Sequence, residues 1–345
     1  MNRASSATVL WVALVIAGPA QTEAGSDFVR EGPPEAPAPA QAQRANTTFD
    51  YTGISPARVQ SGLSVADPTY NRQSGDCDGL SGAGTAVPYE TITITNQTNV
   101  DASFTTSTSN LGNTATCTID TFATAYGPTF VPGNSSANCV TSDDDGGIGL
   151  CSQIRFPIDA GATTVVVVTS SANGATFSYQ ANFEAGLLYR GVDPTGIQGL
   201  LGVEDGVYNR LAGDCAGVSG IGTSVYYDTV LLTNTTGIPV TFDVITSDQG
   251  DPSSCVSVDT FLTVYDPIFV PSNPAANCLT SNDDGGPGTC SAVHFMVEPE
   301  KTVVLVVASY GNGASFTYGL NIEGSIRFSD GFESGDTTAW SSTVP

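Results

Sequence analysis

Apolar and polar residues alternate with a period of two along much of the chain. The clearest runs are rich in β-branched and aromatic residues, which favour strands; in the C-terminal half they are residues 226–233, 239–246, 260–265, 302–307 and 315–322. None of these runs has the 3.6-residue period of a helix. Clusters of Gly, Asn, Asp and Pro separate them at short intervals, as in antiparallel sandwiches and jelly rolls. The pattern predicts an all-β fold.

One run breaks the alternation. Residues 165–168 are Val at every position. A short run that is apolar throughout and bounded by turn residues is typical of a strand with both faces covered. We expect this segment to be a central strand.

The chain repeats itself over a long period. Tyr51 matches Tyr189 and Cys77 matches Cys215 at an offset of 138, whereas Asp120 matches Asp259 at 139. One residue is therefore inserted before Asp259. The period is far longer than the 20–50 residues of solenoid repeats, so each repeat is expected to be a domain that folds alone. We predict a first repeat at residues 49–186 and a second at 187–325, both antiparallel, jelly-roll-like β-sandwiches.

The two ends of the chain differ from the repeats. Residues 1–24 combine an early Arg3 with a short apolar run and small residues, which predicts a signal peptide for export. Residues 25–48 are rich in Pro and Ala and predict an extended linker. Residues 326–345 form a C-terminal tail. No apolar run is long enough to predict a transmembrane helix.

Charge narrows the range of partners. The chain has 34 acidic and 10 basic residues and a net charge of -24. Such a charge repels nucleic acid phosphates and anionic membrane surfaces, so neither is an expected partner. Dispersed carboxylates keep a chain soluble and also attract cations.

Eight cysteines, four in each repeat, fit the disulfide framework of an exported protein. Sequence allows three pairings within each repeat. We predict the pairs nearest in sequence, Cys139–Cys151 and Cys278–Cys290, with Cys77–Cys117 and Cys215–Cys255 completing the set. No free thiol and no thiolate metal site is expected.

The closest match between the repeats is an acidic, glycine-rich loop between two cysteines, at residues 139–151 and 278–290. It supports two interpretations. In one, carboxylates bind Ca²⁺; the candidate ligands are Asp144, Asp145 and Asp120, and in the second repeat Asp283, Asp284 and Asp259, with Asp143 as an alternative to Asp120. In the other, Asp caps backbone amides in a tight turn and Gly supplies positive φ, with no metal. The spacing matches neither an EF-hand nor a calcium-binding nonapeptide repeat.

Catalytic signals are weak. His294 is the only histidine, and its counterpart in the first repeat is Arg155. A duplicated Ser-His-Asp or Cys-His site is therefore excluded. Glu90 and Asp228 correspond between the repeats and leave a carboxylate-dependent hydrolase as an alternative. Tyr126 and Tyr265 could present aromatic surface to a sugar or peptide, but their alternation favours packing within the sheet. We expect no enzyme activity.

The second half of each repeat resembles the bacterial pre-peptidase C-terminal domain. The resemblance rests on an aspartate-led strand (259–266), the acidic glycine turn (279–288) and a terminal strand pair (303–307 and 316–320), which recur in the first repeat. It implies a jelly-roll β-sandwich appended to secreted enzymes, with relatives that bind collagen and, in some cases, calcium. Here no peptidase domain accompanies the repeats, and four cysteines per repeat are not part of the family pattern.

The tail contains Asp330-Gly-Phe-Glu-Ser-Gly-Asp336 and resembles a tail found on exported proteins of Gram-negative bacteria. Together these observations predict a secreted or cell-surface protein with two binding modules for an extracellular polysaccharide or protein, with Ca²⁺ as the one candidate cofactor. A structural or envelope-surface protein, in which the modules are spacers and the tail directs localisation, is the alternative. The sequence leaves the oligomeric state open.

Overall fold

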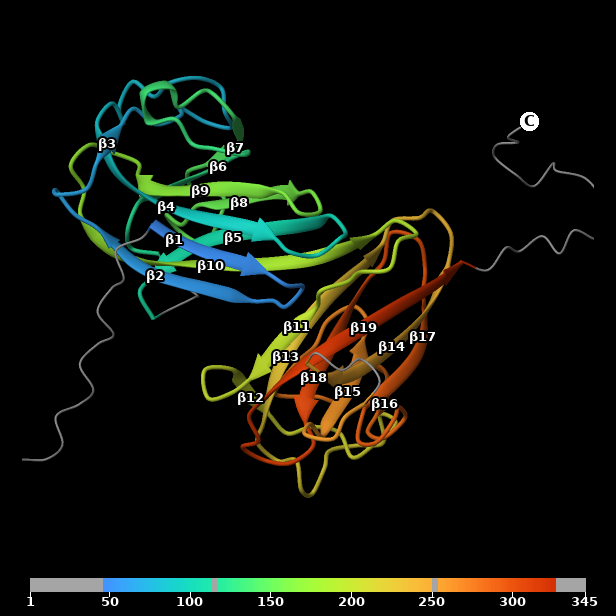
Figure 1. Cartoon of the computed structure of the whole chain (residues 1–345). Coiled ribbons are helices and arrows are strands. Elements are labelled where there is room, and N and C mark those ends of the chain that lie inside the picture. Colours follow the sequence, from blue (N-terminus) through green and yellow to red (C-terminus); the bar gives the residue numbers. More distant parts are fainter. Residues whose placement is uncertain (1–45, 113–116, 250–253, 327–345) are drawn as a thin grey trace, which may run out of the picture. The chain divides into compact units, whose positions relative to one another are not determined.

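A computed structural model describes residues 46–112, 117–249 and 254–326, and Figure 1 shows their strands in chain order. The predicted signal peptide, almost all of the linker and almost all of the C-terminal tail lie outside these residues. The described chain is built from β-strands, with one short 3-10 turn (η1). Within it, no helix is long and apolar enough to cross a membrane.

The strands of the first repeat are β1 (Asn46–Tyr51), β2 (Ala57–Leu63), β3 (Thr69–Tyr70), β4 (Val87–Asn96), β5 (Ala102–Asn110), β6 (Thr121–Tyr126), β7 (Cys139–Asp143), β8 (Gln153–Ile158), β9 (Thr163–Ser170) and β10 (Phe177–Tyr189), with η1 at Pro132–Asn134. One sheet has the order β1-β4-β9-β6-β7, with β3 on β4. The facing layer has the order β2-β10-β5-β8. All pairs within these layers are antiparallel except β1 with β4.

The strands of the second repeat correspond to β2–β10 of the first and follow the same order. They are β11 (Gln198–Leu201), β12 (Gly206–Tyr208), β13 (Val225–Asn234), β14 (Val240–Asp248), β15 (Thr260–Tyr265), β16 (Cys278–Asn282), β17 (Ala292–Val297), β18 (Thr302–Ser309) and β19 (Phe316–Ile326). Its layers are β13-β18-β15-β16 and β11-β19-β14-β17. The predicted all-β class is confirmed, and the five predicted strands of this repeat are β13, β14, β15, β18 and β19.

Alternation of side chains places the core between the two layers of each sandwich. In β4, Ile92 and Ile94 point inward, while Thr91, Thr93 and Thr95, which alternate with them, are partly exposed. Across the core, β5 contributes Phe104 and β8 contributes Phe156, whose rings stack with centroids 5.7 Å apart. The Val run lies in β9, between β4 and β6, and Val166, Val167 and Val168 have no exposed surface. The prediction of a central strand is confirmed.

Two strands depart from the predicted boundaries. β1 begins at Asn46, inside the range assigned to the linker. β10 runs without a break through the boundary at 186/187, and its last four residues pair in parallel with β13. The end of β10 therefore pairs with β13 in the second repeat in the same way as β1 pairs with β4 in the first.

The predicted disulfide pairing is wrong. All eight cysteines are paired, but the bonds are Cys77–Cys139, Cys117–Cys151, Cys215–Cys278 and Cys255–Cys290. Cys139 opens β7, and the acidic turn begins only after Asp143 at the other end of that strand. At ~3.3 Å per residue, four steps of strand separate Cys139 from the turn by ~13 Å. Cys151, at the far side of the turn, is therefore out of its reach.

Each cysteine instead meets a partner from another loop. The loop before β4 runs along β7, where the Cys77 amide donates to Ser142 Oγ over 3.0 Å and Thr141 Oγ1 donates to Asp76 Oδ1 over 2.9 Å. The second bridge ties the entry to β6 to the entry to β8. In the second repeat Thr289 Oγ1, next to Cys290, donates to the Cys255 carbonyl over 2.9 Å. The bridges thus connect loops that lie side by side rather than close the acidic turn.

Candidate metal centre

The acidic turn of each repeat crosses from one sheet to the other. In the first repeat it joins β7, on the edge of the β4 sheet, to β8, on the edge of the facing layer. Its backbone closes on itself, since the Gly147 amide donates to the Cys151 carbonyl over 2.8 Å. Gly149 has a φ of 71°, and the matching Gly288 a φ of 66°, which favours glycine. This turn holds the carboxylates in place.

Asp143 caps the turn. Its Oδ2 accepts the amides of Gly146 (2.6 Å) and Gln153 (2.9 Å). In the second repeat, Oδ1 of Asn282 accepts the amides of Gly285 (2.5 Å) and Ala292 (3.5 Å). A side-chain amide oxygen can accept these hydrogen bonds as a carboxylate oxygen does, which explains why Asn can replace Asp at this position. The interpretation as a turn cap therefore applies to Asp143, which lies outside the group formed by Asp120, Asp144 and Asp145.

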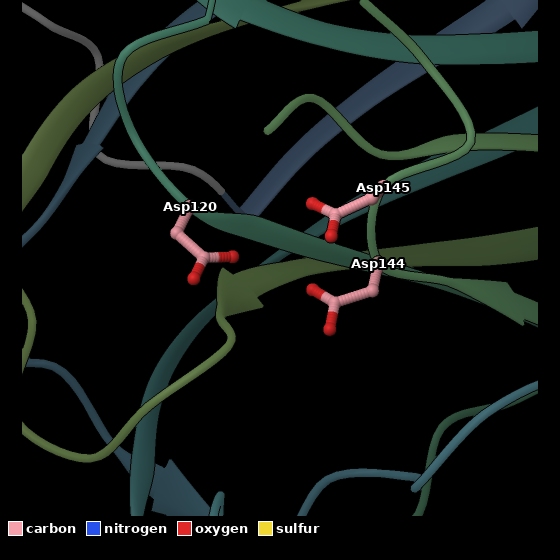
Figure 2. Close-up of side chains that lie close together, drawn as sticks. All are labelled: Asp120, Asp144 and Asp145. Carbon is pink, nitrogen blue, oxygen red and sulfur yellow. The ribbon is translucent and has the colours of Figure 1, made fainter. Parts of the chain in front are cut away.

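Asp144 and Asp145 point the other way, toward Asp120 at the start of β6 (Figure 2). One carboxylate oxygen from each of the three lies within 4.8 Å of the others. Asp259, Asp283 and Asp284 form the same cluster in the second repeat. The structure thus brings together the three candidate carboxylates of each repeat. We name these groups the first and second acidic clusters.

One aspartate of each acidic turn, Asp144 and Asp283, has a raised pKa. Partial burial raises the pKa of Asp144 to about 6, with Asp120, Asp145 and Asp143 adding repulsion and Arg72 opposing it. Partial burial raises the pKa of Asp283 likewise to about 6, with Asp284 and Asp259 adding repulsion and Arg210 opposing it. Three carboxyl groups that share one space and lack a bound cation favour the protonated form of one of them.

The donor set fits a hard divalent cation. Calcium takes oxygen ligands at about 2.3–2.6 Å, so two ligands of one ion are at most ~5 Å apart, and the 4.8 Å limit of each cluster meets this condition. In both clusters one oxygen is also buried without a hydrogen-bond partner, Oδ1 of Asp144 and Oδ1 of Asp283. Buried carboxylate oxygens normally have a partner, and a cation would supply it.

Sequence reasoning missed a buried arginine beside each cluster. Arg72 is 6% exposed and Arg210 1% exposed. Arg72 Nε donates to the Ser171 carbonyl (2.8 Å) and Nη1 to the Gln73 carbonyl (2.7 Å), while Nη2 lies 4.0 Å from Oδ2 of Asp144. Its guanidinium stacks 4.2 Å from the ring centre of Phe122. The signal was present, because Tyr70-Asn-Arg72 recurs as Tyr208-Asn-Arg210 in a chain with only 10 basic residues.

The carboxylates considered for a hydrolase lie elsewhere. Glu90 and Asp228 are buried in matching strands of different repeats. Tyr179 donates its hydroxyl to Glu90 Oε2 over 2.9 Å, and Tyr318 donates to Asp228 Oδ2 over 2.9 Å. Each pair links the two layers of one sandwich across its core, an arrangement that serves packing.

Comparison with known proteins does not identify a family or a function for this chain. No family model and no curated protein matches the sequence. Among solved structures, the CUB1-EGF-CUB2 domains of rat MASP-1 are 11% identical, with 80% of this chain and 99% of that chain covered, at a TM-score of 0.19. The tandem CBM22 domains of Xyn10C from Paenibacillus barcinonensis are 10% identical, with 76% and 100% covered, at 0.18. A fucolectin from striped bass serum is 13% identical, with 79% and 96% covered, at 0.19. At TM-scores this low, we transfer neither ligand nor activity from these proteins.

Proposed function

We propose that this chain is an exported, non-catalytic protein whose two disulfide-bonded β-sandwich modules bind an extracellular polysaccharide or protein and are stabilised by calcium. The observation that carries the proposal is that one module, with the same bridges and the same acidic cluster, is built twice. Two modules on one chain raise the strength of attachment to a repetitive polymer through effective concentration. Export agrees with four disulfides and with the predicted signal peptide.

Calcium would be held by Asp120, Asp144 and Asp145 in the first repeat and by the matching trio in the second. The ion supplies a positive charge that joins the entry of β6 to the acidic turn. The resemblance to the pre-peptidase C-terminal domain, which we retain as a hypothesis, agrees with this role.

Calorimetric melting tests the calcium part. A ligand that binds only the native state adds about 2.7 kcal/mol at 100 times its dissociation constant, which corresponds to a rise in Tm of at least ~5 °C for domains of this size. We expect that rise in CaCl2 relative to EGTA. Asp120→Asn together with Asp259→Asn should abolish it.

Asp143→Asn is the matched control. It introduces the residue that the second repeat already has at this place and should leave the calcium response unchanged. An identical Tm in CaCl2 and EGTA for the unmodified protein would reject calcium binding.

Retention on insoluble polymers tests the binding part. The mature protein should be retained on at least one of cellulose, chitin, collagen and peptidoglycan. No retention on any of them would count heavily against a binding module.

The second candidate function is an envelope-surface protein with spacer modules. It is favoured by the C-terminal tail, which lies outside the described residues. Deletion of residues 330–345 should change the location of the protein in the cell if this is correct, and unchanged localisation would remove its support.

A further inference from the structure

A hollow on the surface of the first repeat lies away from the acidic cluster. It has a volume of about 640 Å³, within the range of small-ligand sites. It is lined by Asp67, Tyr89, Thr91, Thr93, Thr129 and Phe130, among others. Tyr89, Thr91 and Thr93 are partly exposed and alternate along β4 with core residues, so they belong to the outer face of the β1-β4-β9-β6-β7 sheet. We name this hollow the outer groove.

Two rings form a rigid corner of the outer groove. Tyr89 and Phe130 meet with ring centroids 5.1 Å apart and planes at 80°. Tyr70 packs edge-on against both rings at 5.1 Å, and Tyr126 supports Phe130 at 4.7 Å. Tyr70 and Tyr126 are buried, whereas Tyr89 and Phe130 are partly exposed. Partly exposed rings with fixed positions present apolar surface at little cost in conformational entropy.

The backbone under the outer groove is fully engaged. β4 pairs with β1 on one side and with β9 on the other. An extended peptide lying over β4 therefore finds no free edge on that strand, and addition to a free edge is the common route of peptide binding to sheets. Recognition here depends on side chains, namely the hydroxyl groups of Thr93 and Thr129, the carboxylate of Asp67 and the two rings.

We propose that the outer groove of the first repeat binds an uncharged polysaccharide, an inference that rests on the polymer-binding function proposed above. Sugar rings present apolar C–H faces to aromatic rings and hydroxyl groups to threonines and carboxylates. Asp67 lines the groove, and the chain carries a net charge of -24, so an anionic polysaccharide is repelled.

The second repeat provides an internal comparison. It has the same four rings, Tyr208, Tyr227, Tyr265 and Phe269, with neighbouring centroids 4.8–5.3 Å apart. The ring cluster is therefore part of the module itself. The polar lining differs: Leu231 stands where the first repeat has Thr93, and Ile268 where it has Thr129. The hydroxyl groups of Thr93 and Thr129 belong to the first repeat alone.

This difference supplies the test. Thr93→Leu with Thr129→Ile gives the first groove the side chains that the second repeat carries in the same fold, so the variant should fold, as its melting temperature will confirm. Binding of the full mature chain to cellulose, chitin, collagen and alginate is measured as a depletion isotherm. We expect binding to cellulose or chitin, and at least a 10-fold loss of affinity in the double variant. Thr105→Leu, a partly exposed threonine on the outer face of the opposite layer, should bind as the unmodified chain does.

The outcomes separate the two proposals. Retention on collagen alone, or equal binding of the double variant to cellulose or chitin, would overturn the groove proposal and leave the polymer-binding function standing. Binding to alginate as strong as to cellulose or chitin would overturn the charge argument and the proposal with it. Retention on none of the polymers would overturn both.

Discussion

Adjacent residues of the acidic turn have different structural roles because their side chains point in different directions. Asp143 and Asn282 turn back to cap amides of their own loop. Asp144 and Asp145 face Asp120 instead. The sequence showed the acidic residues but not their directions, which depend on a turn closed by backbone hydrogen bonds. The tolerance for Asn at one position and not at its neighbours follows from this division.

Gly146 is expected to be sensitive to substitution. A Cβ added there would lie 2.6 Å from Oδ2 of Asp143, the atom that accepts the Gly146 amide. Gly146→Ala should therefore disturb the cap and lower the free energy of unfolding by about 1–2 kcal/mol, as urea unfolding would measure. Gly133→Ala is the control, because a Cβ there meets nothing within 4 Å. Equal stabilities of the two variants would contradict the assigned role of the cap.

Asp228 should make stability depend on pH. Burial raises its pKa from 3.8 to about 7, with repulsion from Asp205 in the same direction and the Tyr318 hydroxyl opposing. The folded chain thus keeps a proton that the unfolded chain releases. The stabilisation is complete below the unfolded pKa and is lost as pH rises through the folded pKa, at up to about 1.4 kcal/mol per pH unit.

Asp228→Asn stays neutral at every pH and isolates this effect. Between pH 5 and pH 8, the free energy of unfolding of the unmodified chain should fall more than that of the variant. Urea unfolding at several pH values measures both curves. Parallel curves would show that Asp228 ionises in the folded chain as it does in the unfolded one.

At the scale of the elements, periodicity predicted the strands well. The five runs in the second repeat and the Val run in β9 are all strands. Their side chains either alternate between a buried and an exposed face or are buried on both faces. β16 and β17 were not singled out. β16 is short and mostly polar, β17 is short with one histidine among apolar residues, and each lies on the edge of its layer, where one flank is unpaired. The disulfide pairing could not be predicted from the sequence, because it depends on which loops lie next to each other in the fold.

Peptide mapping checks the pairing directly. Trypsin does not separate the cysteines of the first repeat, since no basic residue lies between Arg72 and Arg155. Cleavage before aspartate places all four on different peptides. Without reduction, the Cys77 peptide should be linked to that of Cys139, and the Cys117 peptide to that of Cys151. A link between Cys139 and Cys151 would contradict the fold.

Each bridge should also contribute to stability. The bridges close loops with sequence separations of 62 and 34, for which the chain-entropy relation gives about 4 kcal/mol each. Replacing Cys117 and Cys151 by Ala should lower the free energy of unfolding by an amount of that order, measured by urea unfolding. A stability equal to that of the unmodified chain would show that this bridge does not constrain the unfolded state.

At the scale of the whole molecule, the duplication makes the chain its own comparison. The strands recur at the offsets of 138 and 139 read from the sequence, from β4 and β13 at the first offset to β9 and β18 at the second. Features present in both repeats, such as the ring clusters and the acidic clusters, belong to the module. Features present in one, such as Thr93, mark where the repeats have diverged.

Calcium stoichiometry should reflect this duplication. Equilibrium dialysis of the full chain is expected to give two ions per chain. Asp144→Asn with Asp145→Asn should leave one, and Asp283→Asn with Asp284→Asn should also leave one, because each cluster draws its ligands from its own repeat. Binding of two ions by either variant would place calcium outside the acidic clusters.

The buried arginine beside each cluster affects what happens when no cation is bound. Arg72 is fixed by two carbonyl groups and by the ring of Phe122, which hold its positive charge beside Asp144. Part of the repulsion among the carboxylates is thus relieved by the protein's own counterion. A chelator should then increase the mobility of the loops around the turn while the sandwich stays folded. A zinc finger, in contrast, unfolds when its metal is removed. The cation would adjust the stiffness of a module whose architecture is already complete.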